Sequence, residues 1–336
     1  MAEIVLGMWT SHGPTLSTTA EQWLLRVEAD KRNRHPFRGH IYGFDELVAL
    51  RKGEGLDQAC APEERERRAA SCQQSIEEMA DRFEAAKIDV AVIFGNDQRE
   101  LFLEDITPAI TVYLGDTIWD QPATPEQGQR MPPGIHEAEW GHSPPERREY
   151  PCLPDLGTHV CTSLLPQGWD LAVSKRLPEP PGHWSSGAPH SLGFIYRQIM
   201  RDRVIPNLPI LINTFFPPNQ PSARRCFELG RAVGAAIRSW KSDVRVGVFG
   251  SGGMSHFVID EQFDRMFFEA LRTRDAETLC RIEDRHLQSG TSELKTWIAA
   301  AGALFDTDLK GEVIGYEPCY RSEAGTGTAN GFVAWQ

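Results

Sequence analysis

Short apolar segments alternate with amphipathic segments along this sequence, and that alternation limits the fold more than any other feature. Residues 3–8, 90–94 and 244–249 are short apolar runs, which predict buried strands. Over 67–87 and 222–240, apolar residues recur at steps of three and four, which is typical of helices with one buried face. Strands that alternate with helices predict an α/β fold. Further strands are expected at 110–114, 171–173 and 209–215, and helices over 260–273 and 292–304 to complete the core.

Prolines concentrate in one part of the chain. Eight of the 23 prolines fall between residues 120 and 155, and they predict a long inserted loop with little regular structure of its own. Such a loop is suited to act as a lid or as an arm that contacts a partner. A second loop, residues 178–189, precedes His190.

Charge and composition exclude several classes of protein. The chain has 336 residues, with 47 acidic against 35 basic side chains and a net charge of −12, so a polyanionic partner such as nucleic acid would be repelled. No apolar run approaches the roughly 20 residues that span a bilayer, and the first residues lack the pattern of a signal peptide. The seven cysteines include no CxxC pair, so neither a disulfide framework nor a structural zinc site is indicated. We therefore expect a cytoplasmic protein without nucleic-acid or membrane partners.

Three polar clusters, at residues 11–13, 96–99 and 252–256, follow predicted strands. Ligands of open α/β sheets collect at the carboxyl ends of strands, so these loops are expected to share one site. The glycines around 252 do not complete a dinucleotide-binding motif, and no GxSxG nucleophile elbow is present. Glu293 lies in the first turn of a predicted helix, where an acid ordinarily complements the helix dipole. The residues by themselves leave metal binding and a structural role open.

Several motifs resemble the class III extradiol ring-cleavage dioxygenases. The most specific is Gly252-Gly253-Met254-Ser255-His256. The others are Thr10-Ser11-His12-x-Pro14, Asn96-Asp97, Pro217-Pro218, Arg225-Cys226-Phe227-x-Leu229-Gly230, Phe263-Asp264 and Glu293-Leu294-x-x-Trp297. Residues 1–30 are most similar to the branch that acts on 3-O-methylgallate. The resemblance implies a single catalytic domain over 1–336, an α/β fold with a mixed sheet flanked by helices, into which the proline-rich loop 120–155 is inserted.

The resemblance also implies a reaction and the residues that perform it. Members of the family bind Fe(II) through two histidines and one carboxylate, which leaves positions for a catecholate and O₂. His12 would be the first metal ligand and Glu293 the carboxylate, while His256 would act as the catalytic acid and base. His190 resembles the second active-site histidine of the family, which lies near the substrate. The implied activity is extradiol cleavage of a catecholic or gallate-type aromatic acid, as in the breakdown of lignin-derived aromatics.

Gln98 departs from the family pattern. Where the pattern has Asn-Asp-His, this chain reads Asn96-Asp97-Gln98, so the second histidine ligand is missing. The amide oxygen of Gln98 is a hard neutral donor for Fe(II), although weaker than imidazole, and we expect it to be the second metal ligand. Asp97 is one alternative, and another histidine such as His40 or His190 is a further one.

The sequence leaves two other functions possible, and it does not identify the residues that bind the substrate. The same scaffold suits a metal-dependent hydrolase or hydratase that needs no O₂, and loss of a ligand is how an enzyme becomes a non-catalytic relative. An aromatic acid needs a cation in the site, and Arg99 and Arg225 are the candidates among the arginines near the motifs. The long loops could replace a small second subunit, so we expect a homo-oligomer, most simply a dimer.

Overall fold

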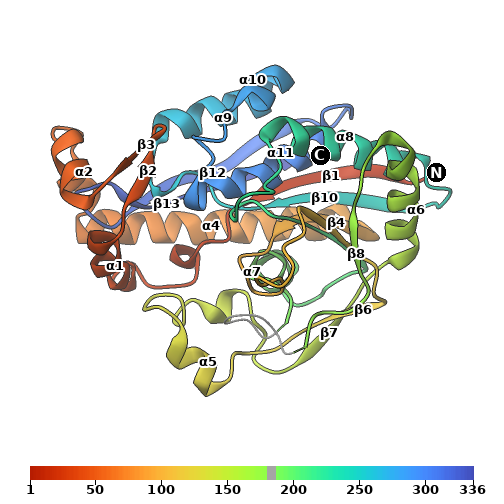
Figure 1. Ribbon diagram of the computed structural model, residues 1–336, viewed down its shortest axis with the longest axis horizontal. Helices are drawn as coiled ribbons and strands as arrows, with labels where there is room; N and C mark the ends of the chain where they lie inside the picture. Colours follow the sequence, from red (N-terminus) through yellow and green to blue (C-terminus); the bar gives the residue numbers. More distant parts are fainter. Residues whose placement is uncertain (180–186) are drawn as a thin grey trace.

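A mixed β-sheet forms the centre of the protein. The structure is a computed structural model that describes residues 1–179 and 187–336 (Figure 1). Within these residues the central sheet has nine strands, in the order β11-β13-β1-β10-β4-β9-β5-β8 with β12 paired to β13. Its strands are β1 (Glu3–Thr10), β4 (Val90–Asn96), β5 (Ile110–Tyr113), β8 (Ala172–Ser174), β9 (Asn207–Ile212), β10 (Arg245–Ser251), β11 (His256–Val258), β12 (Gly311–Tyr320) and β13 (Thr326–Trp335).

The strands in the middle of the sheet run parallel. β1 pairs with β10, β10 with β4 and β4 with β9 in parallel register, whereas β13 runs antiparallel to β1 and β5 antiparallel to β9. Parallel strands are usually covered on both faces, and accordingly every residue of β4 is buried. The α/β class and the mixed sheet flanked by helices, both predicted from the sequence, are confirmed.

Helices cover both faces of the sheet. The α-helices of the described residues, some of which lie outside these layers, are α1 (Val27–Arg32), α2 (Phe44–Leu50), α3 (Leu56–Ala59), α4 (Pro62–Ala86), α5 (Pro125–Arg130), α6 (Pro154–Leu164), α7 (His190–Phe194), α8 (Ala223–Ser239), α9 (Glu261–Thr273), α10 (Ala276–Arg281) and α11 (Leu294–Leu304). Among the described residues no helix is both long enough and apolar enough to cross a bilayer.

Two hydrophobic cores result, one on each face. α4 packs on one face and the pair α8 and α11 on the other (Figure 1). Successive side chains of β4 alternate between them, so that Val92 belongs to the core under α8 and α11 and Ile93 to the core under α4. α8 and α11 approach closely because Gly302 lies against the backbone oxygen of Phe227, where a Cβ atom would clash.

The proline-rich segment 120–155 is more regular than the sequence predicts. Strands β6 (Thr117–Asp120) and β7 (Arg148–Pro151) pair antiparallel and close the segment at its base. Inside it, Thr124 caps α5 and Pro125 occupies the first position of that helix, where proline is tolerated. The expectation of little regular structure was therefore wrong, because several of these prolines stand at the boundaries of short elements. The second loop, 178–189, falls partly outside the described residues.

The C-terminal residues also differ from the expectation, which ended the core with the helix over 292–304. Residues after α11 form the hairpin of β12 and β13, and β13 lies beside β1 inside the central sheet. All of β13 is buried, but its first half contains glycine, threonine and asparagine, so its sequence is neither an apolar run nor a regular alternation of apolar and polar residues. The strand is therefore part of the core that the sequence pattern did not reveal.

A buried ion pair fastens the N-terminal segment to this hairpin. Arg321 donates through Nε and Nη2 to the two carboxylate oxygens of Asp30, at 2.6 and 2.9 Å. The hydroxyl of Thr326 donates to the same carboxylate at 2.7 Å. Because both charged side chains are at most 5% exposed, each depends on the other for compensation of its charge.

Replacing Asp30 tests the importance of this pair. Asp30→Ala leaves Arg321 buried without its counterion, and we expect the free energy of unfolding to fall by about 3–5 kcal/mol. Glu269→Ala is the matched control, since Glu269 makes the same double contact with Arg272 on the surface, where we expect little change. Urea unfolding followed by circular dichroism measures both variants. A small effect in both would contradict a stabilising role for the buried pair.

Candidate metal centre

The predicted polar clusters do meet at one edge of the sheet. The parallel strands β1, β4 and β10 end together there, and the chain leaves them toward His12, Gln98 and Gly252. Carboxyl ends of parallel strands form the usual binding edge of such a sheet. Glu293 reaches the same point from the short helix Ser289–Glu293, which precedes α11.

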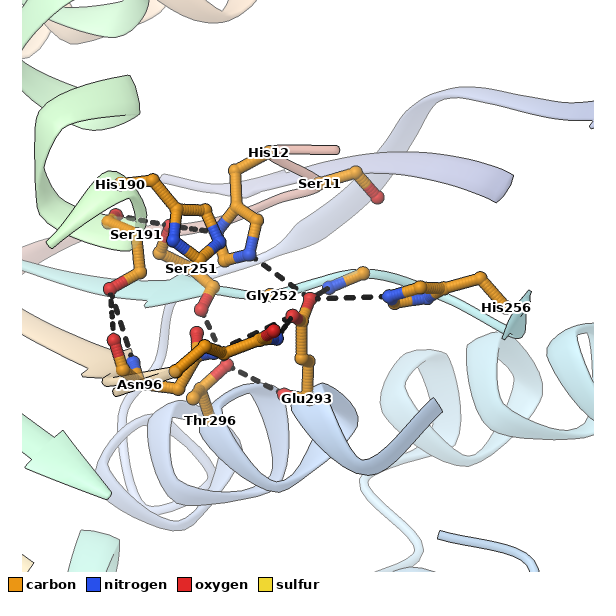
Figure 2. Close-up of polar contacts among 12 residues, drawn as sticks. Ser11, His12, Asn96, His190, Ser191, Ser251, Gly252, His256, Glu293 and Thr296 are labelled. Carbon is orange, nitrogen blue, oxygen red and sulfur yellow. Dashed lines mark hydrogen bonds and ion pairs between the residues drawn. The ribbon is translucent and has the colours of Figure 1, made fainter. Parts of the chain in front are cut away.

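Glu293 is the centre of the resulting cluster (Figure 2). Its Oε2 lies 3.0 Å from His12 Nε2 and 3.6 Å from His256 Nε2, and it accepts the Gly253 backbone N–H at 2.9 Å. One ligand atom each from His12, His190 and Glu293 lie within 4.8 Å of one another. At these separations a single metal ion could bind all three residues.

The electrostatics of the cluster keep its carboxylate charged. Burial raises the pKa of Glu293, but the neighbouring His12 and His256 outweigh that effect and bring the pKa down to about 2. Burial lowers the pKa of His12, which favours the neutral imidazole. An ionised carboxylate and a neutral imidazole are the forms that bind metals.

His190 is oriented by a buried acid, Glu100, that sequence reasoning missed. Its Nδ1 donates to Glu100 Oε1 at 2.5 Å and its backbone N–H to Glu100 Oε2 at 2.8 Å, which leaves Nε2 available. Burial lowers the pKa of His190, but the charge of Glu100 overcomes this and raises the pKa to about 9, so a metal ion at Nε2 would have to displace a proton from this ring. Histidines that bind metals commonly donate their other N–H to a carboxylate in this way.

Gln98 reaches the cluster, although through its nitrogen. Its Nε2 donates to Glu293 Oε1, so here the amide positions the carboxylate and does not present its oxygen. Asp97 is engaged elsewhere, because its two oxygens accept the backbone N–H groups of Glu100, Leu101 and Phe102 at 2.8–3.0 Å. Asp97, His40 and His190 are the alternatives to Gln98 as the second metal ligand. Of these three, the structure brings His190 to the cluster.

His40, by contrast, lies exposed in the two-stranded sheet of β2 (His35–Phe37) and β3 (His40–Tyr42). Nor do the two arginines predicted to contact the substrate line the cavity beside the cluster. Arg99 pairs with Glu104 and covers the ring of Phe216, while Arg225 covers the ring of Trp169. Both are used in contacts on the outside of the site.

A cavity of about 240 Å³ opens beside the cluster. The 120–155 segment supplies much of its wall, including the half-buried His142, whose ring centroid is 6.0 Å from that of His190. Burial and the neighbouring His190 lower the pKa of His142 to about 3. Arg26 and Arg321 also line the cavity. No sequence motif marked these three residues, because each enters the site through packing of distant segments.

The donor set fits a divalent first-row transition metal. Two imidazoles and one carboxylate, all from buried or half-buried side chains, match the arrangement that binds Fe(II) and leaves coordination positions open. His12, His190 and Glu293 are the residues that would hold the ion. The chemistry of these donors is therefore compatible with the cofactor implied by the sequence, with His190 in the place expected for Gln98.

Comparison with known proteins gives a family and two relatives. Residues 58–327 match the family described as "Catalytic LigB subunit of aromatic ring-opening dioxygenase". A gallate dioxygenase of Pseudomonas putida is 26% identical over 166 residues, which cover 44% of this chain and 45% of that protein. A 2,3-dihydroxyphenylpropionate/2,3-dihydroxicinnamic acid 1,2-dioxygenase of Photorhabdus laumondii is 35% identical over 97 residues, covering 29% of this chain and 27% of that protein. The chain thus matches less than half the length of either relative.

One solved structure resembles the chain only distantly. It is an uncharacterized protein from Escherichia coli K12, with 15% identity and a TM-score of 0.44, and the match covers 77% of this chain and 91% of that chain. A likeness of this size does not assign the fold.

Metal retention distinguishes His190 from Gln98 as the third donor. After anaerobic loading with Fe(II) and desalting, we expect His12→Ala, His190→Ala and Glu293→Ala to lose most of the metal, because each removes a donor atom. Gln98→Ala should retain it, and Glu100→Gln should weaken metal affinity by roughly 10- to 100-fold through loss of its support for His190. Elemental analysis measures all five variants. Retention in His190→Ala together with loss in Gln98→Ala would return the ligand role to Gln98.

Proposed function

Since this chain belongs to the LigB family of catalytic subunits of aromatic ring-opening dioxygenases, we propose that it is a non-haem Fe(II)-dependent extradiol dioxygenase. Its substrate in this proposal is a catecholic or gallate-type aromatic acid, of which 3-O-methylgallate is one example. The observation that carries the proposal is the buried group of His12, His190 and Glu293 at the wall of a small cavity. The two dioxygenase relatives agree with this class of substrate.

The residues around the cavity suit such a ring. Fe(II) held by His12, His190 and Glu293 would supply the redox chemistry that ring opening by O₂ requires. The cavity volume, about 240 Å³, is below the roughly 300–1,000 Å³ typical of pockets for drug-sized ligands, which favours a single aromatic ring. Apolar side chains such as Trp23 and Ile135 line it and exclude water from the bound ring.

His256 is placed to exchange a proton with a phenol in this cavity. Its Nδ1 donates to the backbone oxygen of Met254 at 2.7 Å, so Nε2 is the nitrogen left to accept a proton. Gly253 and Gly290 lie against the ring, and a Cβ atom at either position would collide with it. The ring is thereby held in one orientation at the cavity wall, as general acid–base catalysis requires.

The remaining polar residues hold this arrangement in place. Gln98 donates to Glu293 Oε1, and Glu100 fixes the ring of His190. In the proposed reaction these are positioning residues. Its catalytic proton carrier is His256, and the second catalytic role predicted for His190 is replaced by metal binding.

Oxygen uptake with different metals tests the proposed function. The protein loaded anaerobically with Fe(II) should consume O₂ with gallate, 3-O-methylgallate or 3,4-dihydroxybenzoate, because ring cleavage needs a redox-active metal. The zinc-loaded protein should not, since zinc has no redox chemistry. An oxygen electrode measures both forms. Turnover of an ester or an alkene with zinc and without O₂ uptake would instead identify a hydrolase or hydratase, and no turnover with either metal would identify a non-catalytic relative.

Replacing His256 tests the proton transfer. His256→Ala should lower kcat by roughly 10²–10⁴ while the Fe(II) content stays near that of the wild type, because the group lost is a proton carrier. His40→Ala is the control, since this exposed histidine lies away from the cavity. Steady-state kinetics and iron analysis are made on the same samples. Loss of iron as complete as in His12→Ala would place His256 among the metal ligands.

A further inference from the structure

We propose that Arg26, supported by Arg321, forms a binding site for the carboxylate of the substrate at the wall of the cavity. This inference rests on the proposed function for the identity of the ligand, an aromatic acid. The site selects ring compounds that carry a carboxylate over neutral catechols.

Within the described residues, Arg26 makes no direct contact with a carboxylate. It ends the short helix Gln22–Arg26 and is half-buried at the cavity. The hydrogen bond found for its guanidinium goes from Nη1 to the backbone oxygen of Pro133 at 3.4 Å, and within residues 1–179 and 187–336 no carboxylate pairs with it. A partly desolvated charge is costly unless a partner compensates it, so the position calls for an anion.

Arg321 adds a second positive charge, and its counterion Asp30 makes its direct arginine hydrogen bonds to Arg321. Arg321 uses Nε and Nη2 on Asp30, and its Nη1 has no hydrogen-bond partner among the described residues. Asp30 is further engaged by Thr326. Burial lowers the pKa of Arg26 and the charge of Arg321 lowers it further, and together they outweigh the opposing effect of Asp30. Two arginines thus face one aspartate, and one positive charge stays uncompensated.

The acids that line the cavity do not neutralise Arg26. Glu293 belongs to the metal cluster, and Glu100 is held by His190. Glu139 accepts the backbone N–H of Ala123 and lies 3.6 Å from His136. Each acid in the cavity wall is therefore occupied by another partner, which leaves Arg26 open to an anionic group of a ligand.

The wall of the cavity also carries apolar side chains, contributed by Pro14, Trp23, Met131, Pro132, Ile135, Ala138 and Phe257. A ligand that suits this cavity has an apolar ring, oxygens for the cluster around Glu293 and a negative group for Arg26. An aromatic acid with neighbouring hydroxyls has all three. A guanidinium binds a carboxylate with two parallel hydrogen bonds, which would also fix the direction of the ring.

The position of Arg26 depends on the proline-rich insertion. Arg26 lies before residue 58, where the match to the family begins. The proline-rich insertion holds it, because Pro133 accepts its hydrogen bond and Gly134 packs beside it, where a Cβ atom would come within 3.1 Å of Arg26 Cδ. The insertion and the N-terminal segment together build the carboxylate site.

Binding of a pair of probes to the metal-free protein tests this site without any turnover. The probes are 3,4-dimethoxybenzoate, which has no free phenol for a metal, and its uncharged methyl ester, each titrated by calorimetry. We expect the wild type to bind the acid more tightly than the ester. Arg26→Gln should weaken binding of the acid by roughly 10- to 100-fold and leave the ester unchanged, since only the charged hydrogen bonds are lost. Arg26→Lys should recover part of the loss, because it keeps the charge and loses the planar pair of donors.

Arg32→Gln is the matched control. It removes the same charge from an exposed position in α1, six residues along the chain, and should change neither titration. Equal affinity of the wild type for acid and ester, absence of binding of the acid, or equal weakening of both probes in Arg26→Gln would each overturn the carboxylate site. The proposed function fails separately, if the Fe(II) form consumes no O₂ with any catechol while acid binding still depends on Arg26.

Discussion

The buried carboxylate of Glu293 is the feature on which the rest of the site depends. Removing an ionised carboxylate from water is costly, and here His12, the Gly253 backbone N–H and the amide of Gln98 compensate it. These groups come from the ends of three different strands. The charge is therefore tolerated only when the sheet has its native strand order, so the site and the fold are stabilised by the same interactions.

The 120–155 segment covers this sheet edge and makes it one wall of a partly enclosed cavity. Trp140 donates through Nε1 to the backbone oxygen of Ser17 at 2.7 Å, and Gln198 donates to the backbone oxygen of Gly141 at 3.2 Å. The insertion is thus fastened on one side to the N-terminal segment and on the other to the chain that follows α7. A partly enclosed cavity of this kind strengthens the interactions of its charged groups, because less water reaches them.

Much of the fold could be predicted from periodicity, and the failures have a common cause. β1, β4, β10 and the helices α4, α8 and α11 show clear apolar patterns, because each element buries the same face or faces along most of its length. β13 has no such pattern: it is buried on both faces and carries small residues such as Gly331, which faces Phe268, Met254 and Trp297. β13 lies beside β1 because of a pairing between residues far apart in the chain, and no local sequence pattern indicates such a pairing.

The sequence by itself determined the chemical groups of the site: a histidine after the first strand, a glycine-rich loop that carries His256, and Glu293 at a helix start. It also indicated that the second histidine of the family pattern is replaced at Gln98. Only the tertiary structure decided that Gln98 directs its nitrogen to Glu293, that His190 joins the cluster with Glu100 behind it, and that Arg26 lies at the cavity. The physical reason is that local sequence fixes which groups follow a strand, whereas the partner of each group depends on the order of strands and on packing between segments far apart in the chain.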